Sequence, residues 1–267
     1  MVIKIDQIMN RLKEHYKVAD EYGFEPIGIF LQGSQNYGLE TPESDIDSKV
    51  IVLPKFDDFL LNKKPVSFTH IMENDEHVDF KDIRLYMKCF FKQNINFVEI
   101  LFTDYFILNP GYQDLWMNLK ERAEDIARYD IKAALNCIAG MAFEKQKALT
   151  HPYPSTMDKI EKYGYDAKQL HHILRLQEFI DRYIKGEKYS DCLKSKNIKY
   201  LIRVKQNLYS LEDAKVIADF TVTNIKKTKD KYLETHYQYP NDELKDFMNS
   251  VMASMVKRSF IRQLGGD

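Results

Sequence analysis

The residues from Gly33 to Asp47 include two groups that could act together on a phosphate. The first group is Gly33 and Ser34, which follow the short apolar run of residues 27–31. An apolar run of this length followed by Gly-Ser predicts a buried strand that ends in a tight turn. Such a turn can offer backbone N–H groups and a hydroxyl to an anion, so we take Gly33 and Ser34 as a candidate phosphate-binding turn.

The second group is Asp45 and Asp47, two carboxylates separated by one isoleucine. On a strand, side chains alternate between faces, so both carboxylates would project from the same side. Neighbouring carboxylates repel each other and resist ionisation unless a cation lies between them. Such oxygen ligands suit Mg²⁺ or Mn²⁺. A phosphate-binding turn beside a divalent metal ion is the equipment for phosphoryl or nucleotidyl transfer.

Either group could also be incidental, because an Asp-x-Asp arises often by chance in a chain that is 30% charged. Each would then be part of a turn followed by the solvated acidic end of a strand. In this order and spacing, however, they resemble the signature of the polymerase-β-like nucleotidyltransferase superfamily. Its stand-alone bacterial and phage members read G-S-x-x-Y-G-x-x-x-x-x-S-D-x-D. The matching residues here are Gly33, Ser34, Tyr37, Gly38, Ser44, Asp45 and Asp47.

This resemblance implies transfer of a nucleoside monophosphate from an NTP to an acceptor nucleophile, with release of pyrophosphate. Asp45 and Asp47 would bridge one or two Mg²⁺ ions, or Mn²⁺ in their place. Gly33 and Ser34 would bind the β- and γ-phosphates. In the superfamily, a third acidic residue on a neighbouring strand helps to hold the metal and receives the proton from the attacking hydroxyl.

Two residues are candidates for the third carboxylate, Asp79 and Asp82. Asp79 alternates with Val78 and Phe80, so its side chain would lie on the open side of the sheet if those two pack into the core. Asp82 directly precedes a helical pattern and is better explained as an N-cap. We assign Asp79 to the metal site and to general base catalysis, keep Asp82 as the alternative, and interpret Glu76 as a turn residue.

A second group of chemistry-bearing residues lies in the segment that reads GYDAKQLHHILRL, residues 164–176. Lys168, His172 and Arg175 are spaced i, i+4 and i+7, so they share one face of a helix that Asp166 would cap. Cationic side chains in a row repel one another unless a bound anion, such as a triphosphate, neutralises their charge. The alternative is an ordinary solvated stripe on an amphipathic helix.

The same stand-alone nucleotidyltransferases carry G-Y-D-x-K-x-x-x-H-x-x-R-L in their helical half, and every fixed position is matched here. The resemblance therefore implies that Lys168, His172 and Arg175 contact the nucleotide phosphates or the acceptor. His171 lies outside this pattern and is expected to be a packing or surface residue.

The elements that would position these residues divide the chain near residue 109. Apolar periodicity predicts a helix over residues 4–22 and strands over residues 26–31 and 45–53. It also predicts a hairpin over residues 66–83 and a further helix from residue 82 onward. After Pro110, amphipathic helices are expected over residues 112–127, 131–149, 167–184, 212–234 and 242–264. The predicted fold is α/β (α+β). A small, mixed, twisted sheet forms the catalytic domain, residues 1–109, and a helical domain, residues 110–267, closes the active-site cleft.

Composition narrows the class of protein. The net charge of −1 over 267 residues gives no overall attraction to nucleic acid, so strong duplex binding is not expected. Three widely spaced cysteines argue against a zinc site or a disulfide framework and for a reducing compartment. The sequence has neither a membrane-spanning apolar segment nor a signal-peptide pattern, so we expect a soluble, cytoplasmic protein with no membrane partner.

The sequence leaves the acceptor open among an RNA 3′ end, a protein side chain and a small molecule, and the near-neutral charge favours the last two. A different class of function is a non-catalytic nucleotide-binding module that regulates a partner, or a toxin–antitoxin component. The presence of Asp45, Asp47 and a candidate third carboxylate favours an enzyme.

Overall fold

The computed structural model describes residues 5–41, 44–236 and 239–265, and the chain divides into two compact units. Unit 1 consists of Met1–Asn36, Glu40–Tyr129 and Pro240–Asp267, and unit 2 of Tyr37–Leu39 and Asp130–Tyr239. These bounds differ from the expected division near residue 109. The difference arises because residues 110–129 and the C-terminal helix contribute to the core around the sheet.

Unit 1 is built on a five-stranded mixed sheet with the strand order β3-β4-β2-β1-β5. Strand β2 is parallel to β4, and the other neighbouring pairs are antiparallel. The strands are β1 (Glu25–Gln32), β2 (Asp47–Leu53), β3 (Ser67–Ile71), β4 (His77–Asp82) and β5 (Phe106–Leu108). The chain therefore has the mixed α/β fold class that the sequence predicts. A small sheet comes first in the sequence, and a helical region follows it.

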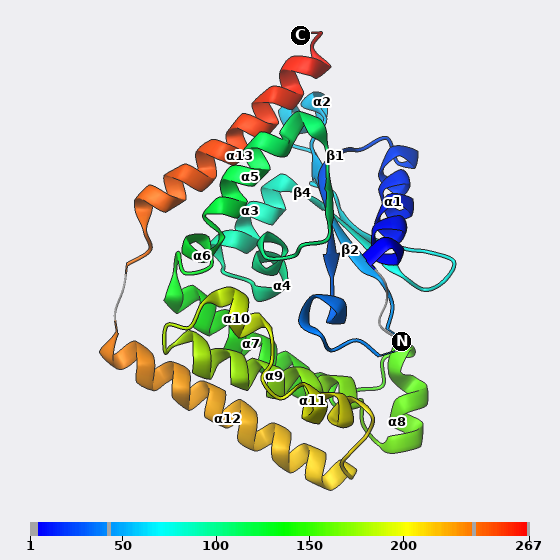
Figure 1. The fold of residues 1–267 in the computed structure, drawn as a ribbon, viewed down its shortest axis with the longest axis vertical. Coiled ribbons are helices and arrows are strands. Elements are labelled where there is room, and N and C mark those ends of the chain that lie inside the picture. The colour runs from blue at the N-terminus through cyan, green and yellow to red at the C-terminus, as the bar shows by residue number, and fades with distance from the viewer. Residues whose placement is uncertain (1–4, 42–43, 237–238, 266–267) are drawn as a thin grey trace. The chain divides into compact units, whose positions relative to one another are not determined.

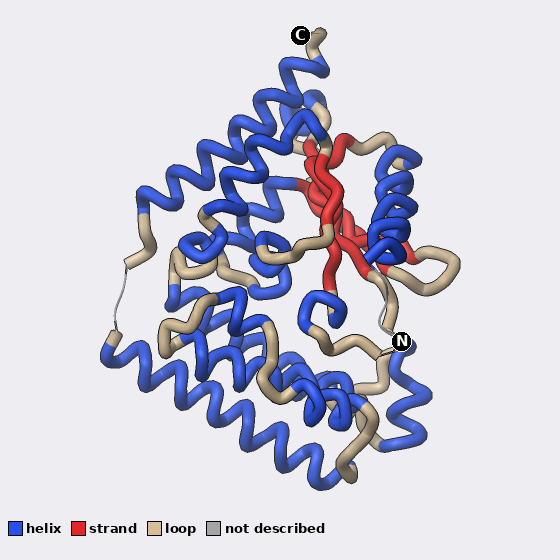
Figure 2. Tube along the Cα trace, viewed as in Figure 1, coloured by secondary structure: helices blue, strands red, loops and turns tan. Residues whose placement is uncertain are grey.

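Helices cover both faces of this sheet (Figures 1 and 2). The helices of unit 1 are α1 (Ile5–Glu21), α2 (Phe56–Leu60), α3 (Ile83–Phe91), α4 (Ile95–Val98), α5 (Gln113–Glu121), α6 (Ala123–Ile126) and α13 (Asp242–Gln263). Short 3₁₀ helices are η1 (Ser34–Tyr37), η2 (Glu99–Leu101) and η3 (Pro110–Tyr112). Helix α1 lies on one face, where Leu12 shares an apolar core with Ile29, Val50 and Val78. Because both faces are covered, residues 27–31 of β1 and 50–53 of β2 form short, almost uninterrupted apolar runs.

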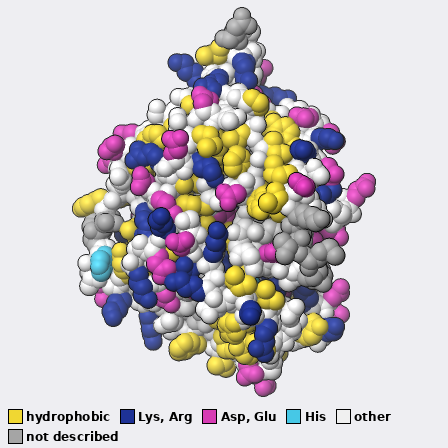
Figure 3. Space-filling model, in the orientation of Figure 1, with side chains coloured by type: hydrophobic (Ala, Val, Ile, Leu, Met, Phe, Trp, Pro, Cys, Tyr) yellow, Lys and Arg dark blue, Asp and Glu magenta, His cyan; other side chains and the backbone are white. Residues whose placement is uncertain are grey.

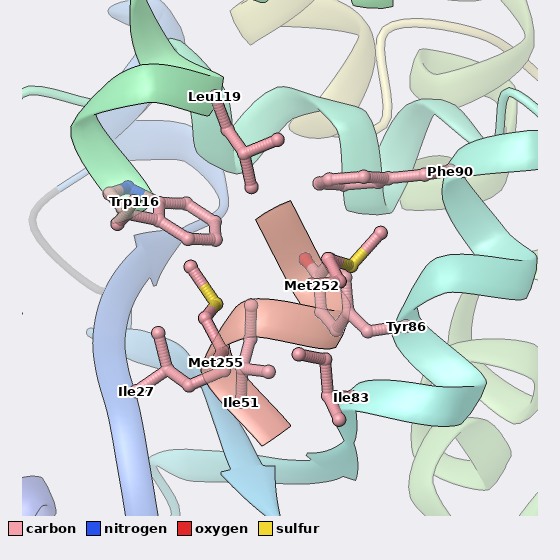
Figure 4. A pocket seen from close by; sticks show the side chains of 9 residues that line it. All are labelled: Ile27, Ile51, Ile83, Tyr86, Phe90, Trp116, Leu119, Met252 and Met255. Carbon is pink, nitrogen blue, oxygen red and sulfur yellow. The ribbon is translucent and has the colours of Figure 1, made fainter. Parts of the chain in front are cut away.

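The core on the opposite face joins β1 and β2 to helices α3, α5 and α13. These elements surround a small apolar cavity (Figure 4), which is lined by Ile27, Ile51, Ile83, Tyr86, Phe90, Trp116, Leu119, Met252 and Met255. The ring of Trp116 packs on that of Phe30, with 4.4 Å between their centroids. Residues far apart in the sequence therefore share one core.

Polar contacts also fix α13 against the first strand. Glu25 of β1 accepts hydrogen bonds from Ser259 at 2.5 Å and from Arg262. Tyr112 donates its hydroxyl to the same carboxylate, and burial together with Glu25 raises the pKa of Tyr112 to about 12. The phenol therefore stays protonated, and this end of α13 is held by a connected network.

Unit 2 is a helical bundle in which α9 packs against α7, α11 and α12. Its helices are α7 (Ile131–Ala148), α8 (Met157–Tyr163), α9 (Ala167–Tyr183), α10 (Tyr189–Leu193), α11 (Ile198–Lys205) and α12 (Leu211–Thr235), with the 3₁₀ helix η4 (Pro154–Thr156). Leu170 and Ile173 of α9 are fully buried in its core together with Ala214 and Ala218 of α12. The small residues of α12 allow the two helices to approach closely.

Most of the expected elements are confirmed, with boundaries shifted by a few residues. The helix expected over residues 112–127 is interrupted at Arg122, where α5 ends and α6 begins. Lys4, the first residue of the expected N-terminal helix, lies outside the described residues. On the face shown in Figure 3, Lys and Arg side chains are interspersed with Asp and Glu. None of the helices described is both long and apolar enough to cross a membrane.

Candidate functional site

The candidate phosphate-binding turn lies where β1 ends. Gly33 has φ +95°, a backbone conformation that L side chains rarely adopt, and η1 begins at the next residue, Ser34. The side chain of Asn36 fixes the turn through two hydrogen bonds. Its Nδ2 donates to the backbone carbonyl of Leu31 at 2.9 Å, and its Oδ1 accepts from the hydroxyl of Thr103 at 2.7 Å. The tight turn expected from the sequence is therefore present.

The two aspartates lie beside this turn. In the antiparallel pair of β1 and β2, Gln32 is directly opposite Asp47, so the residue before Gly33 neighbours a candidate metal ligand. Strand β2 begins at Asp47, and exposed Asp45 precedes it, separated by buried Ile46. The expected strand from residue 45 is thus shorter, but the alternation of exposure around Ile46 is retained.

The Asp47 carboxylate is held by the neighbouring strand. Its Oδ1 accepts a hydrogen bond from the backbone N–H of His77 at 2.9 Å, and the Nδ1 of the same histidine lies 3.3 Å away. On the other side, the side chain of Gln35 donates to the backbone carbonyl of Asp45 at 2.5 Å. These contacts fix the segment that carries both aspartates.

Asp79 lies on the face of β4 opposite to buried Val78 and Phe80, as the alternation predicts. Its partner in the parallel β2–β4 pair is Lys49, and the Nζ of Lys49 is 3.8 Å from Oδ2 of Asp79. Asp82, the alternative candidate, is 1% exposed and caps α3 by accepting from the backbone N–H of the second residue of that helix. Its expected role as an N-cap is confirmed.

Lys49 is a buried cation among these carboxylates. It is 6% exposed, it donates to the side-chain oxygen of Gln32, and its Nζ lies 4.8 Å from the centre of the Phe97 ring. Burial lowers the pKa of Lys49, and the charge of Asp79 opposes that shift. Three separate contacts therefore hold this ammonium group in place.

The three candidate carboxylates differ in their partners among the described residues. Within the part of the chain that the structure describes, no three His, Cys, Asp or Glu side chains lie close enough together to hold a metal ion. Asp79 is paired with Lys49, whereas no hydrogen bond or ion pair joins the Asp45 carboxylate to another described side chain. Asp45 and Asp47 could hold one ion, whereas a cation bound at Asp79 would lie close to the Lys49 ammonium, which is 3.8 Å from Oδ2 of Asp79.

A buried polar network supports the start of β2 from the opposite face of the sheet. His15 of α1 is within 3.0 Å of both Ser48 Oγ and Glu76 Oε2, and Arg11 also binds Glu76. Glu76, which the sequence places in a turn, is only 6% exposed. Since Ser48 directly follows Asp47, this network fixes the backbone of a candidate metal ligand.

Unit 2 holds the second candidate group. Asp166 caps α9 by accepting from the backbone N–H of Lys168 at 3.1 Å, as expected. Burial lowers the pKa of His172 well below its ordinary value, and the charges of Arg175, Lys145 and Lys168 lower it further. His172 is therefore neutral near pH 7, so it can form a hydrogen bond but adds no charge to the group.

Lys145 of α7 joins this group from a second helix. Burial lowers the pKa of Lys145, the charge of Lys168 lowers it further, and Asp166 acts in the opposite direction. We call Lys145, Lys168, His172 and Arg175 the cationic cluster of unit 2. A bound anion would relieve the repulsion among its three cations.

Arg175 packs on an aromatic ring from the first motif. Its guanidinium carbon lies 4.2 Å from the centre of the Tyr37 ring, and Tyr37 is 4% exposed. The Tyr37 hydroxyl has no hydrogen-bond partner among the described residues. Tyr37 and Arg175 both belong to unit 2, and Tyr37 is the last residue of η1, the 3₁₀ helix that begins at Ser34.

His171 has a packing role, as expected. It is 4% exposed, and its Nδ1 lies 3.0 Å from the backbone carbonyl of Leu201. Burial lowers the pKa of His171 to about 4, against the effect of this hydrogen bond. It is therefore a neutral core residue that joins α9 to α11.

No protein-family model matches the chain, and no curated protein matches it either. One solved structure, a nucleotidyltransferase-like protein from Exiguobacterium sibiricum 255-15, is similar at 14% identity over 95% of this chain and 91% of that chain. The TM-score of this pair is 0.33.

The sequence did not indicate Lys49 or His77 as members of the candidate group in unit 1, nor Lys145 as a member of the group in unit 2. One signal was available for Lys49, because a lysine within an apolar strand is seldom left buried without a partner. Lys145 and His77 carry no such signal, since their positions depend on how helices pack and on strand register. Tyr37 belonged to the matched pattern, but only the structure gives it a contact.

Proposed function

We propose that this protein is a nucleotidyltransferase that moves a nucleoside monophosphate from an NTP to an acceptor and releases pyrophosphate. The observation that carries the proposal is the pairing of Gln32 with Asp47. This pairing brings the Gly33–Ser34 turn next to the candidate metal ligands. A phosphate-binding turn and a pair of carboxylates that come together in this way can bind an NTP with its metal ion.

Asp45 and Asp47 would hold one Mg²⁺ or Mn²⁺ ion. Such an ion, when bound, neutralises phosphate oxygens and polarises the α-phosphate towards attack. The chain's own contribution at this point is to orient the ligands: the backbone N–H of His77 fixes Asp47, and the side chain of Gln35 fixes the backbone at Asp45. Preorganised ligands of this kind do not need to rearrange during the reaction.

The remaining groups would bind phosphate oxygens. The backbone at Gly33 can approach the phosphates closely because it has no Cβ, and the Ser34 hydroxyl can donate a hydrogen bond. In the cationic cluster of unit 2, Lys168 and Arg175 would neutralise charge on the leaving pyrophosphate, and neutral His172 would donate a hydrogen bond. Positioning and charge stabilisation supply most of the rate in phosphoryl chemistry.

Incubation with labelled NTPs tests this proposal. The purified chain is mixed with a cell extract, with Mg²⁺ or Mn²⁺, and with each NTP labelled at either the α- or the γ-phosphate. We expect α-label to become attached to an acceptor and γ-label to appear only in pyrophosphate. The Asp45→Asn variant is the matched control, and it should attach no label. Binding of an NTP without transfer to any acceptor would indicate a non-catalytic nucleotide-binding module instead.

The contact between Tyr37 and Arg175 gives a second prediction. Tyr37→Leu removes the aromatic face beneath the guanidinium and should weaken NTP affinity about five- to tenfold, as expected for a shielded cation–π contact. Tyr37→Phe keeps the ring and should change the affinity by less than about twofold. Calorimetric titration with the NTP in Mg²⁺ measures both variants. Equal affinities for the wild type and the leucine variant would show that the ring does not orient Arg175.

A further inference from the structure

Among the residues that the structure describes, Lys49 is the one buried lysine, and it lies on the same face of the sheet as Asp47 and Asp79. It follows Asp47 by two residues on β2, so both side chains project from the same side. The parallel pairing of β2 with β4 places Lys49 directly opposite Asp79, and their charged atoms are 3.8 Å apart. The ammonium therefore already occupies the side of Asp79 that faces β2.

The ammonium group of Lys49 is held in place by its contacts. Its side chain is 7% exposed, and Gln32, Asp79 and the ring of Phe97 all contact its ammonium group. Gln32 and Asp79 belong to the strands on either side of β2, and Phe97 belongs to α4. Moving the lysine out would leave an unpaired carboxylate and an unfilled space next to Phe97.

We infer that Lys49 supplies, as a fixed ammonium, the positive charge beside Asp79, and that the site therefore takes a single divalent cation, held by Asp45 and Asp47. This inference rests on the nucleotidyltransferase function proposed above. A second divalent ion between Asp47 and Asp79 would lie next to the ammonium and be repelled by it. Asp79 is then a positioning residue, which holds Lys49, and not a metal ligand.

The location of bound Mn²⁺ tests the inference directly. Crystals of the full chain are grown with MnCl₂ and the α,β-methylene analogue of the NTP that the transfer assay identifies, and anomalous diffraction locates the metal. We expect one Mn²⁺ that contacts Asp45 and Asp47. A second Mn²⁺ in contact with Asp79 would overturn the inference while leaving the proposed function intact. Nucleotide bound without Mn²⁺ at Asp45 or Asp47 would overturn the proposed function itself.

Variants measured in solution give an independent result. Mn²⁺ affinity in the presence of the same analogue is measured by calorimetry for Asp79→Asn, and it should stay within about twofold of the wild type because Asp79 is not a ligand. A loss of tenfold or more would overturn the inference.

Lys49→Met should gain a second Mn²⁺ site, and Lys49→Met combined with Asp79→Asn should lose that site again. Lys81→Met is the matched control, because the Nζ of Lys81 lies 5.2 Å from the same Phe97 ring and its hydrogen bond goes to Ser67. This control should keep a single Mn²⁺ site. A single site in a folded Lys49→Met variant would show that the ammonium does not exclude the second ion. If Lys49→Met does not fold, the Asp79→Asn measurement and the crystal decide the question.

Discussion

Replacing Asp47 by asparagine is expected to lower the rate of nucleotidyl transfer by at least about 10³-fold. Asparagine keeps the carbonyl oxygen that accepts the backbone N–H of His77, so the start of β2 should retain its structure. It removes the negative charge, and a neutral oxygen is a much weaker ligand for a hard divalent cation. We therefore expect a folded protein with almost no activity.

This prediction is checked by measuring transfer and thermal unfolding on the same samples. The Asp47→Asn variant should unfold at a temperature close to that of the wild type, because the repulsion between Asp45 and Asp47 is relieved while the hydrogen bond remains. Asp20→Asn is the matched control, an exposed aspartate of α1 outside the site. Transfer by Asp47→Asn at the wild-type rate would remove this residue from the catalytic site.

The second large effect, a loss of stability, is expected on replacing His15, which contacts β2 from the face of the sheet that α1 covers. His15→Leu keeps a side chain of similar size but removes the ring contacts to buried Ser48 and Glu76, so that Glu76 keeps only its bond with Arg11 from α1. The loss of both hydrogen bonds should lower the free energy of unfolding by about 2–4 kcal/mol. Chemical denaturation measures this change. A loss below about 0.5 kcal/mol would show that the network does not hold the sheet and α1 together.

The same residue gives a pH dependence with a defined sign. Burial lowers the pKa of His15 in the folded protein, although its hydrogen bond to Glu76 acts in the opposite direction and nearby Arg11 adds to the lowering. Protonation therefore favours the unfolded chain, and stability falls as the pH drops below the unfolded value of about 6.5.

Glu76 acts at lower pH. Burial by itself raises the pKa of Glu76, but hydrogen bonds from Arg11 and others bring it below its ordinary value, so its contribution is lost only below about pH 4.5. Denaturation midpoints between pH 8 and pH 5 should therefore fall more for the wild type than for His15→Leu. Parallel curves for the two proteins would exclude His15 as the titrating group.

Local patterns were sufficient to predict most of the fold. The apolar runs around Ile29 and Val50 identify two buried strands, and the aspartates at positions 82 and 166 mark the starts of α3 and α9, where their side chains cap the helices. Strand β5 was not foreseen, because three residues are too few to show an alternation. Its place beside β1 depends on long-range pairing, which no local pattern encodes.

The site was only partly predictable for a related reason. The types and spacing of Gly33 and Asp47 indicate them as site residues. The sequence does not show that Lys49 lies opposite Asp79, because this pairing depends on the register of β2 and β4. Similarly, a single helix pattern indicates Lys168 and Arg175, whereas Lys145 joins them only through the packing of α7 on α9. Residue types suggest the chemistry, and long-range contacts decide which charges meet.

The position of α13 in the sequence has a consequence for synthesis on the ribosome. Met252 and Met255 of this helix line the core of unit 1, and Arg262 binds the first strand, yet α13 is made only after the whole of unit 2. The nascent sheet therefore lacks part of its apolar core until α13 has been made. During that interval, the face of the sheet that α13 later covers is exposed, and transiently exposed apolar surface of this kind favours aggregation.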